Sequence, residues 1–149
     1  MNISDFANSI QLQLSDLEDV GELGYINGIS NIIIKNLREL DITQRPIHCT
    51  DAKREILYVK DQDKWEKENE QKDKMVGFVK NVANKNIKLL NEFKNNYPDC
   101  AKRESRHSDH YNKLVIEAMG GSCNNNYEEK HEKIIKKISK EVIIDKEIL

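Results

Sequence analysis

Apolar residues recur every three or four positions in several stretches of the chain, and each such stretch predicts a helix with one buried side. The expected helices are 4–17, 25–40, 75–93, 108–119 and 127–142. Ser4 and Ser108 are suitable N-caps for the first and the fourth. We expect an acidic, glycine-marked break at 19–24 and a helix end at Gly120-Gly121.

The pattern changes after Arg45-Pro46, where the helical spacing ends. Residues 55–60 contain β-branched and aromatic side chains and make the best strand in the sequence. Shorter strands are expected at 47–50 and 64–66, so residues 47–66 predict a small antiparallel hairpin or three-strand meander. Such a sheet is too small to be stable alone and must lie against helices. Trp65 is the expected lid of that contact.

The sequence therefore predicts a mainly α fold of the α+β class, with about five helices and one small sheet. A length of 149 residues fits a single domain. Its expected parts are a helical N-terminal part at 1–44, the hairpin at 45–66 and three helices at 73–149.

The net charge of −2 excludes a basic field over the whole chain, but lysine is locally in excess along 73–96. One face of that helix carries lysine and asparagine, which can contact phosphates or base edges. Alternatively, it is a solvated face in a chain rich in lysine and asparagine. The candidate nucleic-acid-binding residues are Lys53, Arg54, Lys74, Lys85 and Lys88.

His48, Cys49 and Asp51 are the candidate catalytic residues of a cysteine- or metal-dependent enzyme, because a thiol needs a base to become a nucleophile. Neighbouring residues in a strand point to opposite faces, however, so His48 is badly placed to serve Cys49. The alternative is a small buried cysteine in a strand.

Three cysteines without a secretory signal indicate free thiols in a reducing compartment. His107 and His110 lie between Cys100 and Cys123, but their spacing matches no zinc module. We expect neither a metal nor a cofactor. No run of about 20 apolar residues is present, so no membrane partner is expected.

The isoleucine stripe of 25–40, which includes Ile29 and Ile33, has two interpretations. It can pair with a second copy of the chain, or it can pack on the chain's own hairpin and C-terminal helices. Ile29, Ile33, Tyr58 and Trp65 are the candidate apolar anchors for a partner. A non-enzymatic interaction module, docking a protein or self-associating, is the first functional hypothesis. Nucleic-acid binding is the second and an enzyme the third.

Two segments carry a family resemblance: Arg45 to Glu55, which reads R-P-I-H-C-T-D-A-K-R-E, and Ala118-Met119-Gly120-Gly121. With the ending at 140–146 they resemble an uncharacterised C-terminal domain in proteins of giant nucleocytoplasmic large DNA viruses. Those proteins often carry a Cys/His zinc finger, but no cysteine precedes Cys49 here. The resemblance implies an intracellular viral module, not secreted, that works beside a nucleic-acid reader in the host cytoplasm or a viral factory.

Overall fold

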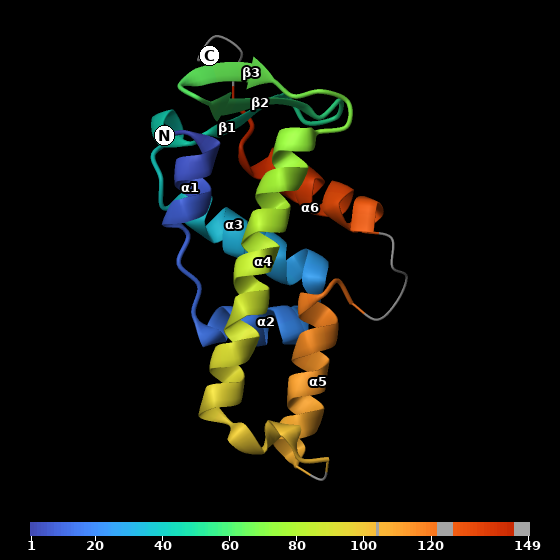
Figure 1. Cartoon of the computed structure of the whole chain (residues 1–149). Coiled ribbons are helices and arrows are strands. Elements are labelled where there is room, and N and C mark those ends of the chain that lie inside the picture. The colour runs from blue at the N-terminus through green and yellow to red at the C-terminus, as the bar shows by residue number, and fades with distance from the viewer. Residues whose placement is uncertain (104, 122–126, 145–149) are drawn as a thin grey trace.

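The computed structural model describes residues 1–103, 105–121 and 127–144. Within these ranges the chain forms six α-helices and one three-stranded antiparallel sheet, which confirms the mainly helical α+β fold (Figure 1). The elements in chain order are α1 (Ile3–Ser9), α2 (Leu14–Leu23), α3 (Tyr25–Arg38), the 3-10 turn η1 (Ile42–Gln44), β1 (Ile47–Asp51), β2 (Ile56–Asp61), β3 (Lys64–Lys67), α4 (Asp73–Asn96), the 3-10 turn η2 (Pro98–Ala101), α5 (Arg106–Ala118) and α6 (Tyr127–Glu141).

The sheet has the order β1-β2-β3 and lies at one end of the molecule, with the helices on one side of it (Figure 1). This confirms the predicted meander. Ile47, Cys49, Leu57 and Val59 alternate along β1 and β2 and are all buried in the same core cluster as the helices. Residues 142–144 extend the sheet beyond β1, because Cys49 exchanges backbone hydrogen bonds of 2.9 Å with Val142 and Ile144.

Helix α4 passes through two hydrophobic clusters. Its first half contributes Met75, Phe78 and Val82 to a cluster that includes the sheet, α1, α3 and α6. Its second half contributes Leu90 and Phe93 to a cluster formed with α2 and α5. One long amphipathic helix therefore joins the two cores.

The single helix predicted at 4–17 is two helices, and that prediction was wrong. α1 begins after Asn2, whose backbone N–H donates to Asp5, and α2 begins after Gln13, whose N–H donates to Asp16. Ile10 is extended and buried between them. The Lys85 side chain donates to the carbonyl oxygen of Ile10 at 3.1 Å, so a group 75 residues away stabilises the break.

Three further local predictions were wrong. The break expected at 19–24 is only the turn at Gly24, which has φ 91° and follows directly after α2. Ser105, not Ser108, caps α5 and accepts from the backbone N–H of His107 at 3.1 Å. His131 stands among glutamates and lysines in the sequence, a setting that predicts a solvated side chain, but it is buried.

Trp65 does not cover the contact between sheet and helices. In the pairing of β2 with β3, Trp65 lies opposite Lys60. The chain neighbours of Lys60, Val59 and Asp61, face inward, so Lys60 faces outward. Because side chains alternate along a strand, Trp65 is on the face turned away from the helices. It is an exposed side chain there, at 38 % relative accessibility.

Asn86 is a fully buried amide on α4 at the level where the two clusters meet, and no described residue hydrogen-bonds its side chain. A buried unsatisfied amide costs about 1–3 kcal/mol. We expect Asn86→Leu to raise the free energy of unfolding by at least about 1 kcal/mol, measured by urea denaturation. Asn81→Leu, on an exposed position of the same helix, is the control and should give no such gain. Destabilisation by Asn86→Leu would contradict this account.

Candidate functional site

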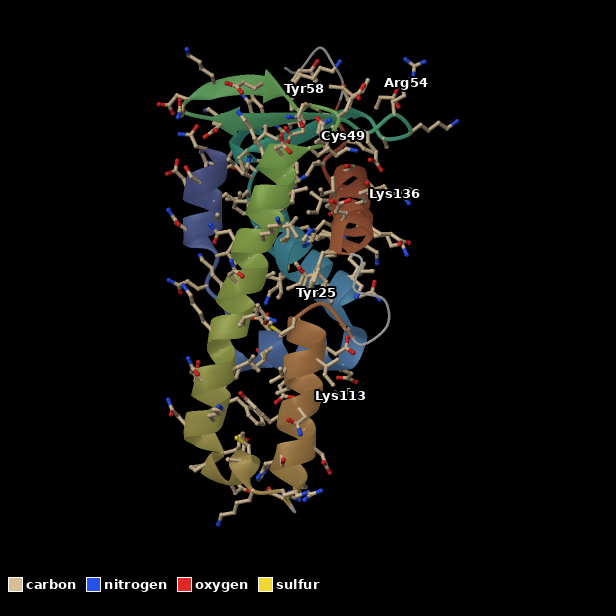
Figure 2. All side chains as sticks on the ribbon, turned by 45° about the vertical axis from the view of Figure 1, so that its right-hand side comes forward. Tyr25, Cys49, Arg54, Tyr58, Lys113 and Lys136 are labelled. Carbon is tan, nitrogen blue, oxygen red and sulfur yellow. The ribbon has the colours of Figure 1, made fainter. Side chains whose placement is uncertain are left out.

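The outward face of the sheet collects aromatic and basic side chains. We define the outer sheet face as His48, Tyr58, Lys60, Trp65 and Lys67. The register places His48 opposite Tyr58, Tyr58 opposite Lys67, and Lys60 opposite Trp65, so all five share one face. Figure 2 shows Tyr58 at the end of the molecule remote from α2 and α5.

Charges in the sheet are sorted between its two faces. Asp61 and Glu66 alternate with Lys60 and Lys67 and therefore point inward. Both acids bind Lys74 at the start of α4, the Asp61 contact being 3.5 Å. The outer sheet face is left with two lysines whose neighbouring acids are turned to the other side.

His48 fixes the position of Trp65. The two rings stack with centroids 4.8 Å apart and an interplanar angle of 27°. Burial, with the nearby charge of Arg45, lowers the pKa of His48 below its ordinary value, so the imidazole is neutral at pH 7. One face of the indole thus lies on a rigid support while the side chain stays exposed.

The five predicted nucleic-acid-binding cations do not form one surface. Lys74 is held by Asp61 and Glu66, and Lys85 donates to backbone carbonyls at the end of α1. These two lysines stabilise the fold, and 11 residues of helix, or about 16 Å, separate them.

The other three cations are exposed at two separate places. Lys53 and Arg54 are in the turn between β1 and β2, and Arg54 reaches Asp51 at 3.8 Å. Figure 2 shows Arg54 projecting from the edge of the sheet. Lys88 is on the middle of α4, in a shallow groove that also contains Asn8, Gly77, Lys80, Asn81, Asn84 and Lys85.

Ile29 and Ile33, proposed from the sequence as anchors for a partner, are fully buried in the chain's own core. Of the two interpretations of the isoleucine stripe, the structure therefore favours internal packing. Tyr58 and Trp65 are the predicted anchors that reach the surface.

His48, Cys49 and Asp51 do not assemble into a nucleophile and its base. Cys49 is completely buried under the sheet, and His48 stacks on Trp65 on the opposite face. Burial is the main cause that raises the pKa of the Cys49 thiol, which opposes formation of a thiolate. Asp51 instead accepts from the backbone N–H of Arg54 in the turn, at 3.2 Å.

Both histidines of α5 have carboxylate partners. His107 lies 2.8 Å from Asp99, and His110 lies 2.6 Å from Glu18. Among the described residues no group of three or more histidine, cysteine, aspartate or glutamate side chains is placed to hold a metal ion. Cys49 and Cys100 are free and buried, and Cys123 lies outside the described residues.

Sequence reasoning missed a cleft beside α4. Its volume is about 350 Å³, and we call it the α4 cleft. It is lined by Tyr25, Lys80, Ala83, Asn84, Ile87, Ala118, Met119, Tyr127 and His131. These residues come from α3, α4, α6 and the end of α5, so their convergence has no local sequence signal. The only hint in the sequence is the presence of the tyrosines and of His131.

A hydrogen-bonded pair forms one wall of the α4 cleft. The hydroxyl of Tyr25 is 3.1 Å from Nε2 of His131. Burial raises the pKa of Tyr25 to about 12, so its phenol keeps its proton and can donate to the ring. Burial and the charge of Lys80 lower the pKa of His131, which keeps the imidazole neutral.

No protein-family model, curated protein or solved structure matches the chain. The resemblance to giant-virus domains, and the intracellular location it implied, therefore stay predictions. No described helix is long and apolar enough to span a membrane.

Stability should fall between pH 7.5 and 5.5, because His131 and His48 have lowered pKa values in the folded state. Such groups bind protons more readily in the unfolded chain, so their stabilising effect is complete above the unfolded pKa of about 6.5 and decreases below it. Tyr25, Tyr127 and Lys80 line the same cleft as His131. Urea denaturation at the two pH values measures the loss.

The variant His131→Gln should show a smaller loss than the wild type, since one of the two responsible histidines is removed. His110→Gln is the matched control, because His110 is a half-exposed histidine of α5 paired with Glu18. An unchanged pH dependence in His131→Gln would contradict the assignment.

Proposed function

We propose that the chain is a binding module whose outer sheet face binds single-stranded nucleic acid. The observation that carries this is the sorting of side chains by the sheet: two aromatic rings and two lysines are outside, and the neighbouring acids are inside. Single-stranded nucleic acid presents flat bases and negative phosphates in alternation, which is the complement of this surface.

Each group on the face has a role in this proposal. Trp65 offers an exposed indole surface for base stacking, and its stack on His48 keeps it in place without a ligand. Tyr58 is half-buried beside it on the middle strand. Lys60 and Lys67 contact phosphates as point charges. Lys53 and Arg54 at the adjacent turn extend the positive charge along the strand direction.

Single strands are favoured over duplex because the stacking groups need exposed base faces. In a duplex the bases stack on one another, and a flat sheet cannot reach their faces. The lysines alone would bind single strands and duplex alike. A higher affinity for the single strand therefore measures the contribution of Trp65 and Tyr58.

The test is fluorescence anisotropy with a labelled oligothymidylate of about 12 nucleotides and a duplex of the same length. We expect tighter binding to the single strand and an affinity that falls linearly with salt on a log–log scale. Trp65→Leu should weaken binding about fivefold or more, since loss of one stacked base costs about 1–3 kcal/mol. Equal affinity for the two forms, or no binding at low salt, would overturn the proposal.

Lys67→Gln and Lys64→Gln form a matched pair, because both change the same charge on β3 but on opposite faces. Lys67→Gln should reduce the magnitude of the salt slope by about 0.7, the value for one phosphate contact on a single strand. Lys64→Gln should leave the slope close to that of the wild type. Equal effects of the two variants would show that only the overall charge matters.

A protein partner is the second candidate, favoured by the free edge of the sheet. All four residues of β3 are exposed, and no described strand pairs with its outer edge. An extended segment of another protein can add there through backbone hydrogen bonds. Lys64 and Lys67 place charge on both faces of this edge strand, and lysine on an edge strand opposes its pairing with a second copy.

We therefore expect the mass from light scattering to be that of a monomer and to stay constant as the concentration is raised. Replacing both lysines, in Lys64→Thr/Lys67→Thr, removes this charge from the edge strand and should increase association. A wild-type mass that rises with concentration would contradict this account and support self-association.

A further inference from the structure

We propose that the α4 cleft binds a small molecule with a flat apolar body and one acidic group. This site is separate from the outer sheet face and does not depend on the function proposed for it. A volume of about 350 Å³ is within the range of small-molecule pockets, which are mostly apolar with a few convergent polar groups.

The apolar residues of the lining account for the apolar body. Ala83, Ile87, Ala118 and Met119 present short or aliphatic side chains from α4 and from the end of α5. The lining also includes the rings of Tyr25 and Tyr127, and the ring centroid of His131 lies within 6.3 Å of the centroids of both. Small apolar side chains together with aromatic rings suit a planar ligand.

Lys80 accounts for the acidic group. Among the described residues of the lining, Lys80 is the charged one and none carries a carboxylate. Lys80 is exposed and forms no ion pair with any residue in the described ranges. Asn84, one turn further along α4, adds an amide donor on the same side. A lone ammonium with a neighbouring amide can bind a carboxylate, a sulfonate or a phosphate.

Acids on one side of Lys80 oppose a second acidic group in that direction. The adjoining hollow toward the start of α4 shares Lys80, Tyr127 and His131 with the cleft, but it contains Asp73, Glu128 and Glu132. These carboxylates would repel a second negative group extending in that direction. The neutral Tyr25–His131 pair adds polarity to the wall without adding charge.

The experiment compares two probes by titration calorimetry at pH 7.5: naphthalene-2-carboxylate and its neutral amide, naphthalene-2-carboxamide. We expect the carboxylate to bind more tightly. Lys80→Gln should weaken carboxylate binding about tenfold, the effect of losing a charged hydrogen bond, and leave the carboxamide unchanged. Lys88→Gln, an exposed lysine of α4 outside the lining, is the matched control and should leave both unchanged.

Two further measurements place the probe. Amide NMR signals of Ala83, Ile87 and Ala118 should shift on addition of the carboxylate, whereas those of β3 should not. Asn84→Trp puts a large ring at an exposed position of the mouth and should abolish binding of both probes. Equal affinity of the two probes, no effect of Lys80→Gln, shifts confined to the sheet, or no binding would each overturn the proposal.

Discussion

The burial of one side of α4 is the interaction on which the rest of the structure depends. Its 24 residues supply side chains to both hydrophobic clusters, so the sheet end and the α2–α5 end are joined through one helix. Lys74 at its start binds two acids of the sheet, and Lys85 at its middle binds the end of α1. Apolar burial supplies most of the stability, and these lysines set where the neighbouring elements begin and end.

The same helix explains where the α4 cleft lies. Ala83 belongs to the first cluster, Ala118 to the second, and both line the cleft. Asn86, buried without a described partner, is on α4 at this level. The two cores thus meet with small residues and an amide rather than with large apolar side chains, and a mostly apolar hollow with a few polar groups is left between them.

The outer sheet face shows how a short sheet separates acidic from basic side chains that are mixed along the sequence. Lysine and acid alternate along 60–67, so the segment has little net charge. Alternation of strand side chains turns Asp61 and Glu66 toward Lys74, and Lys60 and Lys67 to the outer face with Trp65. A neutral segment thereby presents a basic and aromatic surface on one side.

Local patterns in the sequence determined most of the elements. The three strands, the long helix ending before Pro98 and the helix end at Gly120-Gly121 follow from residue spacing and turn residues, and all are present. Contacts between distant residues decided the rest. The break after Ser9 depends on a hydrogen bond from Lys85. The burial of His131 depends on its contact with Tyr25, and the outward position of Trp65 depends on its pairing opposite Lys60. The α4 cleft draws on helices spread over the whole chain, and such convergence is set by packing, which no local spacing specifies.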